Sequence, residues 1–344
     1  MIYKVEMRII PAVAIFLLIP AALSQTPKDP VEKIRQAVKL NTLDTPGMQP
    51  WHLRFDFQTH DFASEKGAKG TLEEWWTPDG YRLVISSDRY NATEVRNTEG
   101  LFRTPQTNPV PYAIGVLQSN IVHPFFGLDL DHAKFDVHRE DFAKITFECY
   151  SLLGELKGGP SFDRRYLFPK YCFLPSEDGL RLTVQQRGQT LPRSTIGVFR
   201  DHRVAVDLGF VLPYEVNAQA HVTALNGIPV AEAKLQDVTG LVKSDPAPAI
   251  MNEGLLRSRL LYRPDPEYPM AAKTAHIGGT VIVLATIGKD GLVKKVDLVN
   301  SRNESLTVAS INAVKGWKFK PILVDGEAVE VHFLIQVNFT FGSE

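Results

Sequence analysis

The chain contains little cysteine and lacks the short motifs that mark common catalytic sites. Its 344 residues include two cysteines, Cys149 and Cys172. Because no C-x-x-C pair occurs, a redox enzyme is not indicated. The patterns H-E-x-x-H, G-x-S-x-G, G-x-x-x-x-G-K and G-x-G-x-x-G are also absent. We therefore expect a protein that is not an enzyme, and the sequence assigns it no catalytic residue, cofactor or metal.

One polar loop is the nearest approach to a metal-binding pattern. The segment HPFFGLDLDH places His123, Asp129, Asp131 and His132 close together. Histidine and aspartate at such spacing ligate metals in some proteins. A loop of solvated polar side chains is the interpretation that we favour, because loops run over the surface.

The chain also lacks an excess of charge of either sign. Lysine and arginine together number 38 and aspartate and glutamate 39, for a net charge of -1. Nucleic-acid binding depends on an excess of basic residues. A nucleic-acid partner is therefore not expected.

No apolar run is long enough to make a membrane span certain. Lys4 and Arg8 precede the apolar residues 9–23, which Pro11 and Pro20 interrupt. A spanning helix needs about 20 apolar residues. Ala22-Leu23-Ser24 has the small residues that precede signal cleavage. The sequence predicts a cleaved signal peptide over residues 1–24, with an uncleaved membrane anchor as the alternative.

The two cysteines lie in strand-like segments, KITFECYSL and YLFPKYCFL. Export leads to an oxidising compartment, where a cysteine pair persists as a disulfide. We expect Cys149 and Cys172 to form a disulfide across neighbouring strands. The alternative is two buried free thiols.

Residues 26–243 alternate between apolar and polar side chains over many short segments. In WHLRFDFQ, for example, Trp51, Leu53 and Phe55 alternate with polar residues, which is typical of a strand with one buried face. Residues 29–43 and 112–122 have helical patterns instead. The sequence predicts a mainly antiparallel β domain with helices that cover its apolar face. A linker is expected at residues 244–254, which begin with the Pro/Ala-rich segment SDPAPA.

The last ninety residues predict a second, smaller α+β domain over 255–344. Two strands flank the turn at Asp290 and Gly291, and a helix follows with Ser305 as the expected N-cap. A long strand, AVEVHFLIQVNFTF, ends the chain. The order is strand, strand, helix, strand.

These ordered residues resemble the C-terminal domain of TonB-type energy transducers. The resemblance covers about a quarter of the chain and depends on a set of matching positions: Tyr268, Pro269, Gly279, Asp290, Gly291, Trp317 and Pro321. It implies a periplasmic protein of a Gram-negative-type cell, active in transmembrane transport. The long Pro-rich spacer expected of a transducer is missing, so binding is expected to persist without energy transduction.

In that family the last strand is a sheet edge that accepts a transporter's N-terminal peptide by strand addition. The resemblance therefore implies a partner-binding edge formed by one parity of the last strand: Val329, Val331, Phe333, Ile335, Val337 and Phe339. The implied partner is an outer-membrane TonB-dependent transporter or another envelope protein. A homodimer through this edge and a plain core strand are the alternatives.

The outline of residues 26–243 is similar to the half-barrel of periplasmic lipoprotein carriers of the Lol family. This second resemblance implies a lipid in a concave face lined by aromatic residues: Trp51, Phe55, Trp75 or Trp76, and Tyr81. It supplies the alternative function, a lipid or lipoprotein carrier with a docking domain. Aromatic side chains on a strand face also fill closed cores, and we favour that interpretation of these residues.

Overall fold

The structure is a computed structural model, and it describes residues 29–106, 110–126, 128, 130–131, 133–153, 169–186, 189–212, 215–245, 249–250, 259–324 and 327–340. The predicted signal peptide lies outside the described residues. None of the helices in the described ranges is long and apolar enough to cross a membrane.

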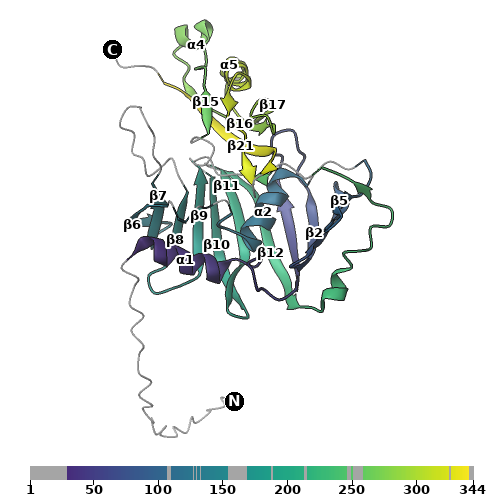
Figure 1. Ribbon diagram of the computed structural model, residues 1–344. Coiled ribbons are helices and arrows are strands. Elements are labelled where there is room, and N and C mark those ends of the chain that lie inside the picture. Colours follow the sequence, from purple (N-terminus) through teal and green to yellow (C-terminus); the bar gives the residue numbers. More distant parts are fainter. Residues whose placement is uncertain are drawn as a thin grey trace, which may run out of the picture.

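A single 13-stranded antiparallel sheet forms the first domain (Figure 1). Neighbouring strands in the sheet are mostly neighbours in sequence, except that β1 pairs with β12 and the short β13 pairs with β5. The strands are β1 Trp51–Thr59, β2 Lys69–Thr77, β3 Gly80–Ser87, β4 Asn91–Asn97, β5 Gly100–Arg103, β6 Phe135–Phe142, β7 Ile145–Leu152, β8 Lys170–Phe173, β9 Leu180–Gln186, β10 Gln189–Phe199, β11 His202–Leu212, β12 Glu215–Gly227 and β13 Val242–Lys243.

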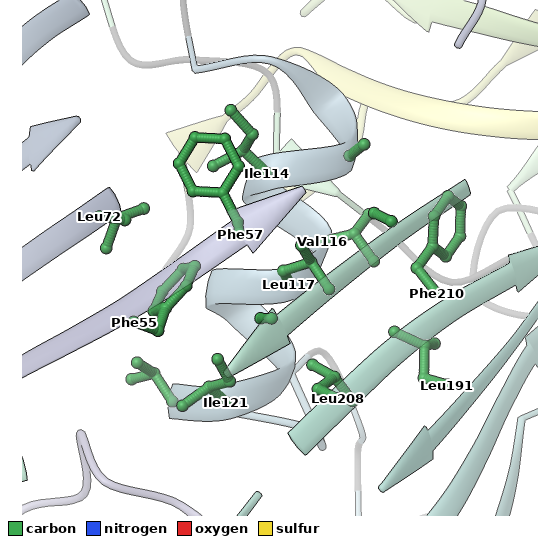
Figure 2. Packing of buried hydrophobic residues seen from close by; sticks show 14 of the residues in the cluster. Phe55, Phe57, Leu72, Ile114, Val116, Leu117, Ile121, Leu191, Leu208 and Phe210 are labelled. Atoms are coloured by element: carbon green, nitrogen blue, oxygen red, sulfur yellow. The ribbon is translucent and has the colours of Figure 1, made fainter. Parts of the chain in front are cut away.

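Two helices lie against one face of this sheet, α1 Pro30–Asn41 and α2 Tyr112–Val122. Asp29 caps α1 by accepting a hydrogen bond from the backbone N–H of Val31 at 2.9 Å. Helix α2 is apolar on nearly all sides, and eight of its eleven residues are buried. A helix with that pattern belongs inside a core. Figure 2 shows its side chains packed against strand residues such as Phe55, Phe57 and Phe210.

The second domain has the predicted order of strand, strand, helix and strand. These elements are β16 Gly279–Ile287, β17 Val293–Asn300, α5 Glu304–Lys315 and β21 Val331–Phe339. Helix α5 is capped by Asn303, whose side chain accepts from the N–H of Leu306 at 3.1 Å, so the expectation that Ser305 caps it was wrong. Asn303 has extended φ and ψ angles and lies directly before the helix, which suits a cap.

Smaller elements join and border the two domains. They are the 3-10 helix η2 Val230–Ala233, the strands β14 Ala249–Ile250, β15 Leu260–Tyr262, β18 Lys318–Phe319, β19 Leu323–Val324 and β20 Glu327–Ala328, and the short helix α4 Met270–Thr274. The mainly antiparallel first domain and the β-β-α-β second domain confirm the predicted fold class. The second domain lies over one set of strand ends of the large sheet, beside α2 (Figure 1).

The C-terminal strand and the domain contact

The last strand, β21, buries one face inside its own domain. Its core-facing side chains are all at most 7% exposed and share a cluster with Leu306 and Val314 of α5: Val331, Phe333, Ile335, Val337 and Phe339. The strand begins at Val331, so Val329 precedes it. Side chains of this parity hold the domain together, and only the backbone of these residues is available to an added strand.

The opposite face of β21 meets the first domain. Leu334 is 3% exposed and, with Leu284 of β16, belongs to the apolar cluster around α2. His332 lies edge-on to Tyr112, with ring centroids 6.2 Å apart. Farther along the same face, Gln336 is half-buried and Asn338 is exposed. The contact between the domains therefore covers only the first half of the strand.

The backbone edges of β21 are occupied unequally. In the four-stranded sheet the order is β14-β21-β16-β17. Strand β16 pairs with β21 from Val331 to Phe339, whereas β14 pairs only with Val331 and His332. In the part of the chain that the structure describes, the outer edge of β21 from Phe333 to Phe339 has no strand partner. Since no described strand pairs with it, this stretch is the candidate for backbone pairing with an added strand.

A cavity of about 570 Å³ lies between the domains, next to the start of β21. Its wall combines apolar residues such as Phe62 and Ile114 with charged ones. Glu65 accepts two hydrogen bonds from the backbone N–H of Tyr112, at 3.0 and 2.8 Å, which places a carboxylate at the N-terminus of α2. Burial raises the pKa of Glu65 despite these bonds. Burial also lowers the pKa of His332, which lines the same cavity.

The residues that carry the resemblance build the second domain. The hydroxyl of Tyr268 donates to the carbonyl of Ile277 at 2.9 Å, and its ring meets Phe339 edge-on. Pro269 precedes α4, and Gly279 begins β16 with φ at +153°. None of these contacts involves the open edge of β21, so these residues position the strand.

The turn between β16 and β17 shows why a glycine is needed. The carboxylate of Asp290 accepts from the N–H of Leu292 at 3.0 Å, and Gly291 has φ at +79°. A Cβ at Gly291 would lie 2.1 Å from the carbonyl oxygen of Phe319. Only glycine fits this left-handed, close-packed position.

Just after the C-terminus of α5, Trp317 packs beside Phe319. The guanidinium of Arg263 lies over the Trp317 ring, 5.5 Å from the ring centroid. Pro321 follows the two-residue strand β18. The helix itself ends earlier, at Lys315, with Gly316 as its C-cap. These residues fix the path from α5 to the last strand.

Cys149 and Cys172 form the predicted disulfide. They are direct partners in the antiparallel pair of β7 and β8. Both are fully buried beside Phe147 and Leu182. The bond joins residues 23 positions apart and links β7 to β8 near one edge of the large sheet.

The aromatic residues predicted to line the first domain's concave face are divided between its two faces. Trp51 and Phe55 are fully buried in the main cluster, and Trp51 stacks on Trp76 at 5.8 Å. Tyr81 also packs against this cluster. Trp75 lies on the opposite face, stacked on His52 at 4.4 Å. Trp76 is therefore the inward member of the pair, and its neighbours belong to a packed core.

A row of buried polar residues crosses the inner face of β2 to β5, which the sequence analysis missed. Gln118 of α2 donates to Glu74 at 2.7 Å, and Tyr81 donates to Glu94 at 2.6 Å. Arg103 donates from Nε and Nη2 to Glu94, at 2.9 and 2.7 Å. Burial raises the pKa of Glu74 to about 7. The register of the strands produces this row, and no short motif marks it.

The loop considered for metal binding does not assemble a site in the described residues. His123 pairs with Asp44 at 2.9 Å, while Asp129 and His132 lie outside those residues. Within the described ranges, no three histidine, cysteine, aspartate or glutamate side chains are placed to hold a metal ion.

Comparison with known proteins finds a family that is similar to the second domain. Residues 264–341 match the family model described as Gram-negative bacterial TonB protein C-terminal. This part of the chain is therefore similar to the C-terminal domain of TonB proteins. Two curated relatives are both named Protein TonB, and they come from two strains of Xanthomonas campestris pv. campestris. Each is 35% identical to this chain over 75 residues. That match covers 22% of this chain and 34% of each relative, so the chain spans about a third of the length of the curated relatives it matches.

Solved structures resemble a larger part of the chain, but loosely. A domain from Vibrio parahaemolyticus described as outer membrane lipoprotein-sorting has a TM-score of 0.37 and 9% identity, covering 60% of this chain and 97% of that chain. A LolA superfamily protein from Nitrosomonas europaea has a TM-score of 0.34 and 8% identity, with the same coverage. Similarity at this level assigns no function to this chain.

Proposed function

We propose that this protein is an exported envelope protein that binds a partner by β-strand addition to the outer edge of β21, in transport across the outer membrane. The observation that carries the proposal is the outer edge of β21 from Phe333 to Phe339, which pairs with no described strand, in a domain similar to the TonB C-terminal family. The partner that fits this family is the N-terminal segment of an outer-membrane transporter.

The chemistry of such an edge favours an extended peptide. Residues 333–339 contain no proline, so every second residue, whose N–H and C=O face away from β16, can supply both groups to a partner strand. The core-facing side chains are buried and unavailable to the partner. Side-chain selectivity would come from the opposite face, where Gln336 and Asn338 lie, and we expect it to be modest and polar.

The first domain stands where the Pro-rich spacer of an energy transducer is expected. Its large sheet and packed helices make a folded body of about 200 residues, which does not extend like a proline-rich chain. We infer that the second domain keeps the binding role while energy transduction is absent. Whether the N-terminal segment is cleaved or anchors the protein does not change this binding mode.

Photo-crosslinking in cells tests the proposal, and the structure indicates where the probes belong. A photoreactive residue at Gln336 or Asn338 leaves the core-facing side chains intact. The matched control is a probe at Leu298, which is 40% exposed on β17, the opposite edge of the same sheet. We expect crosslinks from Gln336 and Asn338, but not from Leu298, to the N-terminal segment of an outer-membrane transporter.

Other results would count against this function. Crosslinks of Asn338 to a second copy of the chain would indicate that the edge forms a homodimer. Equal crosslinking from the two edges would indicate nonspecific contact. If the exported and folded protein gives no crosslink from either β21 position, the edge is not a binding site.

A further inference from the structure

A short segment of the chain already occupies part of the edge proposed for the partner. Strand β14, Ala249–Ile250, pairs in parallel with Val331 and His332. Strand β16 pairs with the other side of β21 along its whole length. Strand β14 therefore lies on the side of β21 where an added strand would pair, at the first two residues.

The same place holds the two domains together. Strand β14 contacts α2 of the first domain, and its pairing partner His332 lies edge-on to Tyr112, the first residue of α2. Two residues on, Leu334 is buried in the apolar cluster around that helix. The start of β21 thus carries both the internal strand and the domain contact.

The internal pairing is short enough to be displaced. It involves two residues in a parallel ladder, and parallel pairing is slightly weaker per residue than antiparallel pairing. The net gain from each backbone hydrogen bond is small because water competes for the same groups. A partner strand that pairs along Val331–Phe339 forms a longer ladder and therefore has the advantage.

We propose that β14 competes with the partner strand for the edge of β21, and that a partner pairing along the whole strand displaces β14 and releases the second domain from α2. This inference rests on the proposed function. The chain carries its own competitor, so binding at the edge and docking of the domains oppose each other. A partner that reaches only Phe333–Phe339 would leave the domains docked.

A covalent lock tests the competition. Positions 250 and 332 are direct partners in the register, so the double variant Ile250→Cys/His332→Cys is expected to form a disulfide in the oxidising compartment. Each single variant is a control, and peptide mass mapping verifies that Cys149 and Cys172 remain paired. With a photo-probe at Asn338 in the full chain, we expect the locked form to crosslink the partner less than the reduced form does, because the lock confines the partner to Phe333–Phe339.

The opposite change should free the edge. Ile250→Pro removes a backbone N–H and disfavours pairing of β14. Ala247→Pro, in the same linker but outside the pair, is the matched control. We expect Ile250→Pro to raise crosslinking at Asn338 and to speed hydrogen exchange roughly two- to tenfold at the one of Val331 and His332 whose N–H faces β14, the range that loss of one net hydrogen bond allows. Ala247→Pro should change neither.

The hydrogen-exchange readout separates this inference from the proposed function. If the disulfide forms and the double variant crosslinks the partner equally well in its oxidised and reduced forms, the competition is refuted while the binding function stands. If exchange at both Val331 and His332 is the same in Ile250→Pro and in the unaltered chain, β14 does not occupy the edge. If no variant crosslinks a partner, the proposed function fails and takes the competition with it, whatever exchange shows.

Discussion

Tyr112 and His332 meet edge to face across the contact between the two domains, with ring centroids 6.2 Å apart. Tyr112 begins the helix at the centre of the first domain, and its N–H is bound by the carboxylate of Glu65. His332 is on β21, whose outer edge from Phe333 onward pairs with no strand among the described residues. The core helix of one domain and the last strand of the other therefore meet at one contact.

The apolar part of this contact predicts that Leu334→Ala loosens the domains. Leu334 is 3% exposed, and truncation of a buried leucine costs about 2–5 kcal/mol. We expect faster proteolysis between residues 244 and 254 and a lower melting temperature. Gln336→Ala, on the same face but outside the apolar cluster, is the control and should leave both measurements nearly unchanged. Equal effects from both variants would indicate that Leu334 makes no special contribution.

The buried imidazole predicts a dependence on pH. Burial lowers the pKa of His332 below its ordinary value of 6.5, although Glu330 and Asp297 act in the opposite direction. The unfolded chain therefore takes up this proton at a higher pH than the folded chain. Stability from the neutral form is complete above pH 6.5 and falls as the pH drops through that value.

Urea unfolding at pH 7.5 and pH 5.5 measures this effect. His332→Gln should lose less stability between the two pH values than the unaltered protein, because its side chain does not titrate. His276→Gln, at an exposed position in the same domain, serves as the control and should retain the full pH dependence. A pH dependence that is the same in all three proteins would rule out His332 as its source.

Glu74 predicts a stabilising substitution at neutral and higher pH. Burial raises its pKa from 4.5 to about 7, so the folded state holds a proton that the unfolded state has already released. The folded protein thus loses stability as the pH rises from 4.5 through 7, by about 3 kcal/mol in total. Glu74→Gln keeps an acceptor for Gln118 and removes the charge.

We expect Glu74→Gln to be more stable than the unaltered chain at pH 8 and similar to it at pH 4.5, as measured by the free energy of unfolding. Glu73→Gln is the matched control, because Glu73 lies on the other face of β2 beside His52 and Arg54. Losing the ion pairs of Glu73 should lower the free energy of unfolding by no more than about 1 kcal/mol. A destabilised Glu74→Gln at pH 8 would contradict burial as the cause.

Local patterns sufficed to predict several elements and failed where distant parts of the chain meet. Helix α2 has the predicted bounds because a mostly apolar segment of eleven residues, bordered by Pro111 and His123, fits a buried helix. The disulfide was predicted because both cysteines stand in strand-like surroundings. Strand β14 was not predicted, since two residues of a Pro/Ala linker carry no periodicity.

The domain contact left a single trace in the sequence. In VHFLIQVNF the alternation of β21 is broken at Leu334, where a polar residue is expected on a solvent-facing side. That leucine is buried by the first domain. The pattern shows that something covers the position, but identifying α2 as the cover requires the tertiary structure. The polar row at Glu74 is similarly a product of strand register.

The disulfide gives the last prediction, a stability change that is independent of the binding edge. Cys149 and Cys172 are 23 residues apart, and closing a loop of that size stabilises a protein by about 3 kcal/mol. Cys149→Ala/Cys172→Ala should lower the free energy of unfolding by this amount or more, because both side chains are fully buried. Alanine avoids placing an unpaired hydroxyl in the apolar cluster with Phe147. Reduced, unaltered protein is the reference for the loop effect alone. The disulfide joins β7 and β8, near the β6 edge of the large sheet and several strands away from β1 and β2. Crosslinking at Asn338 should therefore persist under conditions where the variant remains folded. A loss of crosslinking in the folded variant would show that strand addition depends on the whole first domain, and not only on the contact at Tyr112 and His332.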